Sequence, residues 1–310
     1  MSSADVTTAA TAPTRGGGLL RVARMLAADP FALAAFFFLV FMILAAALGP
    51  IVLPETSVRM NLQMRNAPPF VLENGFAYIL GGDSLGRPIL PRLLVAARTT
   101  LMIAVAVVFC SATIGSTLGL IAGYYGRWLG TLIMRFADVV MSFPSLLLAV
   151  IVLYMLEPRA ANVIIVLAIT RMPVFIRVTR AEVLEVKERL FVEGARAAGA
   201  SDLRIMTLHV MPIVVPTIFT VASLDFANVM LNESSLSFLG IGVQPPDVTW
   251  GLMVASGRNF LTTAWWLAFW PGLAILLTAL AANLLSNWLR LAMDPKLRWR
   301  LERAKERSDG

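Results

Sequence analysis

The fold is decided by residues 31–48, FALAAFFFLVFMILAAAL, an unbroken apolar run that is closed by Gly49 and Pro50. The hydrocarbon core of a bilayer is about 30 Å thick, and a helix needs about 20 apolar residues to cross it. The run is too long for the apolar core of a signal peptide, and no cleavage pattern follows it. We therefore expect a first transmembrane helix that is retained in the mature protein.

The composition agrees with a membrane protein. Of the 310 residues, 58% are hydrophobic and 15% are charged, whereas about 25% of the residues in a typical soluble domain are charged. So few charges cannot cover so much apolar surface in water, which excludes a soluble globular protein. One cysteine, Cys110, and one histidine, His209, exclude a disulfide framework and metal sites that are rich in either residue.

Further apolar stretches bring the expected number of spans to six, which predicts an all-α membrane protein. Six spans place both termini on one side of the membrane. If that side is cytoplasmic, 19 of the 26 Lys and Arg residues lie inside and seven lie outside. Because cytoplasmic segments carry the excess of positive charge, we expect both termini inside. The five further stretches are residues 101–122, 139–156, 160–178, 212–230 and 265–285.

The charged inner segment at residues 180–210 has the pattern of a helix–turn–helix. Apolar residues recur in it at steps of three and four. We expect Gly199 to break the first helix, and Ser201 with Asp202 to cap the second. The chain has no Gly-Lys dipeptide, and hence no phosphate-binding loop, and it has no nucleophile–base pair. The sequence therefore predicts no catalytic residue, no metal site and no ATP hydrolysis by this chain.

Glu193, Ala195 and Gly199, followed by Pro212 thirteen residues after the glycine, resemble the EAA motif of permease subunits from binding-protein-dependent ABC importers. The motif departs from the family pattern at Gly194, which replaces an alanine, and at Met211, which replaces a leucine. The resemblance implies that this segment docks on a cytoplasmic ATPase. The residues that it implies for coupling are Glu193, Ala195, Gly199, Ala200, Ser201 and Pro212.

Other motifs are similar to one branch of these permeases, the second permease subunit of dipeptide, oligopeptide and nickel importers. The likeness extends over roughly residues 24–298. Its residues are Gly82–Arg87 (GDSLGR), Gly123–Gly126 (GYYG), Ser142–Ser145 (SFPS), Glu233–Pro246 (ESSLSFLGIGVQPP) with Trp250-Gly251, and Asp294–Arg298 (DPKLR).

What the resemblance implies is a type I importer in the bacterial cytoplasmic (inner) membrane. Two homologous permeases form the path, two cytoplasmic ATPase subunits hold ATP and Mg, and a periplasmic or lipid-anchored binding protein delivers peptides or a related small solute. This chain itself needs no cofactor and no nucleic acid, and its remaining contacts are with membrane lipid. The alternative is a self-contained secondary transporter or channel, which needs an internal repeat or an ion pathway that the sequence does not display.

Within this scheme the chain divides into four parts. Residues 1–30 form a cytoplasmic, largely disordered tail, and residues 31–92 hold the first span and a periplasmic loop. Residues 93–295 form the permease core with the docking segment 180–210, and residues 296–310 form a cytoplasmic tail.

Polar residues in the predicted spans leave alternatives open. Asp225, Asn228 and Asn232 share one helical face, where they either line the path or hydrogen-bond to other helices. Arg171 also needs a counter-charge, which Asp225 or Asp138 can supply; Asp225 can instead meet a cationic group of the cargo. Small residues at steps of four, Ser111, Gly115, Gly119 and Gly123, predict a close helix contact, either within the chain or with a partner subunit.

Overall fold

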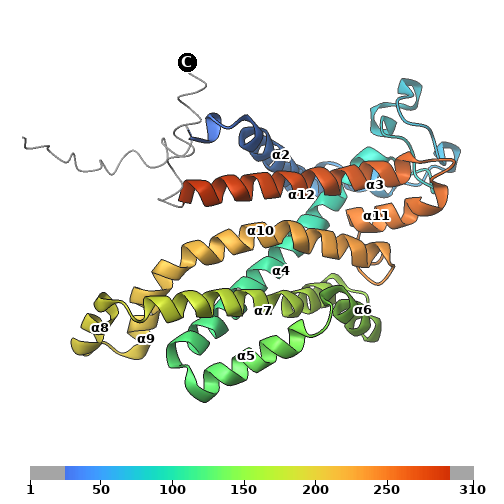
Figure 1. The fold of residues 1–310 in the computed structure, drawn as a ribbon. Coiled ribbons are helices and arrows are strands. Elements are labelled where there is room, and N and C mark those ends of the chain that lie inside the picture. The colour runs from blue at the N-terminus through green and yellow to red at the C-terminus, as the bar shows by residue number, and fades with distance from the viewer. Residues whose placement is uncertain (1–24, 294–310) are drawn as a thin grey trace, which may run out of the picture.

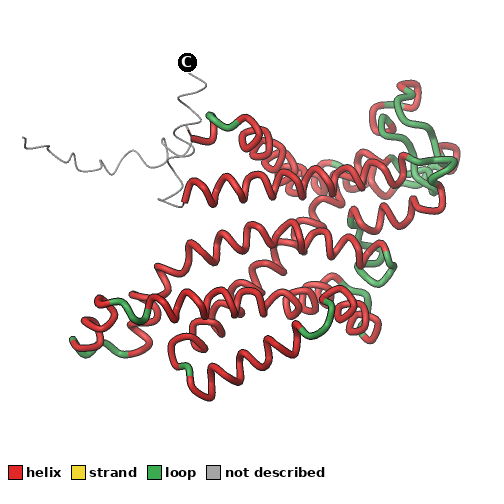
Figure 2. Tube along the Cα trace, in the orientation of Figure 1, coloured by secondary structure: helices red, strands yellow, loops and turns green. Residues whose placement is uncertain are grey.

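The computed structural model describes residues 25–293, and the expectations for residues 1–24 and 294–310 lie outside that range. The described chain is helical and has no strand; Figure 2 shows helices joined by loops, with an extended loop region at one end. The longer helices are α2 (Pro30–Val52), α4 (Ile89–Tyr125), α5 (Arg127–Met141), α6 (Ser145–Met155), α7 (Ala160–Val186), α10 (Met211–Phe238) and α12 (Trp266–Met293). The shorter elements are α3 (Pro54–Val58), α8 (Leu190–Ala197), α9 (Asp202–Arg204), α11 (Trp250–Gly257), the π-helical turn η4 (Ile205–Val210) and the 3-10 turns η1 (Leu62–Met64), η2 (Leu72–Asn74), η3 (Phe76–Tyr78) and η5 (Arg258–Phe260).

Five helices are long and apolar enough to cross a membrane, and a sixth span exists if α5 and α6 are counted as one. The five are α2, α4, α7, the continuous helix Asp202–Phe238 and α12. This confirms an all-α membrane protein. Figure 1 shows α8 and α9 at one end of the molecule and the loop between α3 and α4 at the other.

The first span is confirmed, and its start has a clear local cause. Asp29 caps α2, because its carboxylate accepts the backbone N–H groups of Phe31 and Ala32, each at 3.0 Å, and Pro30 occupies the first turn. Phe37 and Ile43 are each 61% exposed, so this chain leaves a broad apolar face of α2 uncovered.

The third span expected at residues 139–156 corresponds to a bent pair of helices that starts earlier in the chain. Helix α5 ends at Met141, α6 begins at Ser145, and their axes differ by 86°. Pro144 lacks the N–H that would continue the helix, and its ring disfavours a helical conformation at Phe143. The signal was present in the sequence as Ser-Phe-Pro-Ser, inside a stretch whose hydropathy alone indicates a span.

The small residues of α4 pack against α7. The close helix contact that they predict is therefore within the chain and not with a partner subunit. A Cβ atom built on Gly115 would lie 2.8 Å from the carbonyl oxygen of Met172, and one on Gly119 would lie 2.6 Å from that of Ile176. Only glycine permits two backbones to approach so closely. The α4–α7 pair therefore forms the central support for the segment that follows α7.

Candidate functional site

The docking segment predicted at residues 180–210 comprises the end of α7, the short helices α8 and α9, and the turn η4. Helix α7 continues to Val186, α8 follows after three residues, and α9 leads through η4 into α10. The expected helix–turn–helix is present, but its first helix is divided, because α7 ends at Val186 and α8 begins at Leu190. The turn at Gly199 then leads into the Asp202–Phe238 helix. Helix α8 therefore lies along the chain between the ends of α7 and α10.

A small apolar cluster fixes α8 to these ends. Val192 is fully buried and packs in one cluster with Val183 and Val186 of α7 and with Ile205 and Val210 of η4. Two of the predicted coupling residues, Ala195 and Ala200, are half-buried against the same cluster.

Gly199 makes the turn, as expected. Its φ is +81°, a left-handed conformation that residues with a Cβ rarely adopt. The backbone N–H of Gly199 donates to the carbonyl of Arg196 and that of Ala200 donates to the carbonyl of Ala195, both at 3.0 Å, which ends α8. A Cβ on Gly199 would meet nothing within 4 Å, so the constraint is conformational and not steric.

The N-cap of the second helix lies at the predicted residue, but the predicted capping hydrogen bond is not formed. Ser201 occupies the N-cap of α9, but its side chain makes no capping hydrogen bond. The carboxylate of Asp202 instead accepts a hydrogen bond of 2.7 Å from the hydroxyl of Tyr124, at the end of α4. This contact attaches the turn to α4 as well as to α7 and α10.

The outer surface of this segment is apolar and open. Leu190 is 84% exposed and Leu203 is 67% exposed, and Phe191 and Glu193 are also exposed beside them. Exposed apolar side chains around a few charges are typical of a surface that binds another protein.

Pro212 lies on α10, beyond the turn and apart from the other five residues. It cannot donate a backbone hydrogen bond, and the preceding turn η4 is π-helical, with the N–H of Met211 donating to the carbonyl of Met206. A π-helical turn accommodates a proline by widening the helix just before it. The irregular turn before Pro212 is therefore η4, which lies between α8 and α10 in the chain.

In the membrane-spanning part, Arg171 of α7 pairs with Asp225 of α10. The Nε atom of Arg171 donates to Oδ2 of Asp225 at 3.1 Å, and Nη2 donates to Oδ1. The Asp225 side chain is 4% exposed and that of Arg171 is 19% exposed. Of the two counter-charges considered for Arg171, the structure therefore shows Asp225 as its partner. Asp138 instead accepts a hydrogen bond of 2.6 Å from Arg177.

The polar stripe formed by Asp225, Asn228 and Asn232 on α10 has two other members in a different environment. Asn228 is exposed on the surface of the single chain, and Asn232 is half-buried. The stripe is therefore a buried ion pair at one end and an open polar edge at the other. Within the described residues, no hydrogen bond from Asn228 or Asn232 to another helix is recorded.

The sequence analysis did not predict two clusters of polar side chains that the structure contains. Glu233, which is fully buried, accepts a hydrogen bond of 2.7 Å from Ser237, and Ser234 and Thr249 also bond to it. Its neighbours along the chain are polar, but only the fold brings Thr249 of the α11 N-cap to it.

The second cluster is centred on Asp83. Its carboxylate accepts from the backbone N–H groups of Leu85 and Arg87, each at 2.8 Å, from Nε of Arg87 at 2.7 Å, and from Nη1 of Arg92. The sequence Asp-Ser-Leu-Gly-Arg is typical of a turn, and it could have predicted the hydrogen bonds from the two backbone N–H groups to Asp83. The bond to Arg92, on α4, depends on the fold.

Comparison with known proteins agrees with this architecture. Residues 115–299 match the model of the family described as binding-protein-dependent transport system inner membrane component. The chain is 41% identical to the di/tripeptide transport system permease protein DppC of Pseudomonas aeruginosa, over 86% of this chain and 88% of the relative.

Two further relatives extend the comparison. The dipeptide transport system permease protein DppC of Haemophilus influenzae is 37% identical, over 86% of this chain and 91% of the relative. The glutathione transport system permease protein GsiD of Pectobacterium atrosepticum is 42% identical, over 72% of this chain and 74% of the relative. The chain therefore belongs to the family of binding-protein-dependent transport system inner membrane components, as a permease component of an ABC importer.

Proposed function

We propose that this chain forms, with a second permease, the path by which a small peptide crosses the bacterial inner membrane. Di/tripeptide, dipeptide and glutathione permeases are among its relatives, so the cargo that they share is a short peptide or peptide-like molecule. Six spans enclose little by themselves, so a homologous partner is required. A substrate-binding protein delivers the cargo, and ATP with Mg is bound and hydrolysed on separate subunits.

The single observation that carries the proposal is the placement of α8 between α7 and α10. Its exposed apolar residues, Leu190 and Phe191, supply a surface for a cytoplasmic ATPase, while Val192 anchors it to both long helices. Glu193, Ala195, Gly199, Ala200 and Ser201 form this coupling unit in our proposal, and Pro212 shapes the helix that receives the motion. ATP-driven movement of the ATPases would then tilt α7 and α10 together.

The path is assigned to the open polar edge of α10. Asn228 and Asn232 offer uncharged hydrogen-bonding groups on a face that the chain itself leaves uncovered. Amide side chains suit a cargo with both peptide N–H and C=O groups. Asp225, in contrast, is the structural partner of Arg171.

Substituting Gly199 tests the coupling role. Gly199→Ala places a Cβ in a left-handed conformation at a cost of about 1–2 kcal/mol, which reduces the population of the docking-competent turn by roughly 5- to 30-fold. Gly199→Val should act in the same direction more strongly. Both variants should insert into the membrane normally but lose cargo-stimulated ATP hydrolysis, measured in the purified complex.

Gly194→Ala is the matched control for this experiment. Gly194 lies on the same short helix without a positive φ, and a Cβ there meets nothing within 4 Å. Its substitution should leave stimulated hydrolysis unchanged. Equal stimulation in Gly199→Val and wild type would show that this turn has no part in coupling.

We propose that both termini and α8 face the cytoplasm, which places the loop between α3 and α4 outside. A cysteine at Glu73 should react with an impermeant thiol reagent in intact cells, and one at Glu188 should react only after permeabilisation. Both side chains are exposed. Cys110→Ala supplies the background, and the reverse labelling pattern would overturn the orientation.

A further inference from the structure

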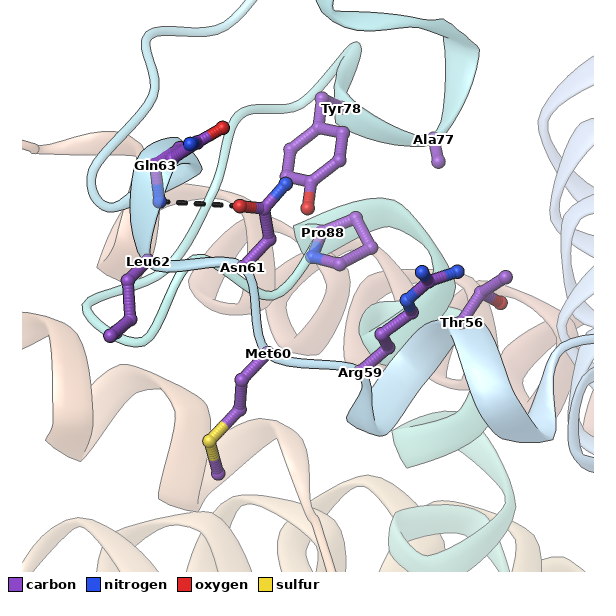
Figure 3. A pocket seen from close by; sticks show the side chains of 9 residues that line it. All are labelled: Thr56, Arg59, Met60, Asn61, Leu62, Gln63, Ala77, Tyr78 and Pro88. Carbon is purple, nitrogen blue, oxygen red and sulfur yellow. Dashed lines mark hydrogen bonds between the residues drawn. The ribbon is translucent and has the colours of Figure 1, made fainter.

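The loop between α3 and α4 contains a pocket of about 770 Å³ that has no part in the function described above. It lies at the end of the molecule opposite α8 (Figure 1). Figure 3 shows Arg59 and Asn61 on either side of Pro88, with the Tyr78 hydroxyl near Asn61 and Pro88.

Two side chains of this pocket, Arg59 and Asn61, offer N–H donors, whereas the hydroxyl of Tyr78 already donates its proton to the carbonyl of Gly86. The Oδ1 atom of Asn61 accepts the N–H of Gln63 at 3.2 Å, so its amide nitrogen is left to donate. Arg59 is exposed, and it forms no ion pair with any of the side chains that the structure describes. Tyr78 stays a neutral hydroxyl, because burial and then Asp83 raise its pKa. An arginine and an amide N–H group together suit a carboxylate.

The nearby acid cannot neutralise Arg59, because it is already fully engaged. Asp83 accepts from Arg87, Arg92 and two backbone N–H groups on the other side of the turn. Its ion pairs with Arg87 and Arg92 leave the cation of Arg59 as the charge that faces the pocket. Because Arg59 is the one charged residue of the described lining, the pocket favours an anion.

The pocket is also preformed. Gly86, at φ +73°, packs so closely that a Cβ on it would overlap the carbonyl oxygen of Asn61. The hydroxyl of Tyr78 donates to the carbonyl of Gly86 at 2.8 Å, which joins the opposite wall to the same turn. Because Asn61 and Tyr78 are held by one turn, little ordering is needed when a ligand binds.

The surroundings favour a protein partner over free cargo. Met60 and Leu62 line the pocket and are 60% and 72% exposed, and Leu72 and Phe76 nearby are each 75% exposed. Apolar side chains around an arginine are typical of protein interfaces. No described lining residue comes from α7 or α10, so the pocket lies off the polar edge assigned to the path.

We propose that this pocket receives an Asp or Glu side chain of the substrate-binding protein, with Arg59 and Asn61 holding the carboxylate. The inference rests on the proposed function, because it requires this loop to face outside and a binding protein to dock there. Such a contact positions the binding protein over the path without entering it.

The test uses the whole complex of both permeases and the ATPase subunits in lipid nanodiscs. The probe is the peptide-binding protein of the same cells, loaded with a dipeptide, titrated against ATP hydrolysis. Arg59→Gln should raise the half-maximal concentration of binding protein about tenfold, with the maximal rate unchanged. Asn61→Asp should raise it too, because an aspartate still caps the N–H of Gln63 but repels a carboxylate.

Arg65→Gln is the matched control, since Arg65 is exposed in the same loop and does not line the pocket. Its half-maximal concentration should equal that of wild type. Equal values for Arg59→Gln and wild type overturn the inference but leave the proposed function intact. A wild-type complex that never responds to the binding protein overturns both.

Two other occupants are distinguished in the same preparation. If a free dipeptide binds the complex without the binding protein, and Arg59→Gln abolishes that binding, the pocket is a cargo site and the inference is wrong. If Arg59→Gln instead releases the second permease during purification, the pocket is a contact between permeases and the inference is again wrong.

Discussion

Asp225→Asn and Arg171→Gln should each destabilise the protein strongly, and the double variant should recover most of the loss. Each single change leaves one charge buried in the membrane without its partner, at a cost of about 3–5 kcal/mol. The double change leaves two neutral groups that can still hydrogen-bond. The measurements are the yield of membrane-inserted protein and the thermal unfolding midpoint of the purified complex.

Arg177→Gln provides the matched control on the same helix. Arg177 pairs with Asp138 at 2.6 Å, but the two side chains are 44% and 46% exposed. Breaking an exposed pair should cost no more than about 1 kcal/mol. If Asp225→Asn folded normally but transported peptides slowly, Asp225 would be a cargo contact; normal folding and normal transport would exclude both roles.

The sequence predicts the membrane fold and most spans, because apolar runs of sufficient length have few alternatives in a bilayer. It does not predict the break at Pro144, where the third span bends and divides into α5 and α6. It also predicts the turn at Gly199, because a glycine is favoured there by the local backbone conformation alone and no tertiary contact is needed.

Tertiary pairings are harder to predict. The need of Arg171 for a counter-charge is visible in the sequence, but the choice between Asp225 and Asp138 depends on how α5, α7 and α10 pack. The pocket at Arg59 is a similar case, because Tyr78 reaches it from a separate turn of the loop. Sequence spacing identifies single turns and helix faces, whereas sites assembled from several elements require the fold.

The contact between α4 and α7 gives the second large effect. Gly119→Ala should separate these helices, because the new Cβ would lie 2.6 Å from the carbonyl oxygen of Ile176 and 2.8 Å from Cβ of Thr179. Neither neighbour is the end of a flexible side chain, so the backbones themselves must move. Overpacking of this kind costs about 1–3 kcal/mol, and more where the backbone is the obstacle.

The same displacement should reach α8, because α7 leads directly into it and the end of α4 bonds to Asp202. We therefore expect Gly119→Ala to lower the unfolding midpoint and to weaken ATPase stimulation together. Gly272→Ala, in α12, is the matched control, since a Cβ there meets nothing within 4 Å. An unfolding midpoint for Gly119→Ala equal to that of Gly272→Ala would mean that α4 and α7 are not in close contact in the membrane.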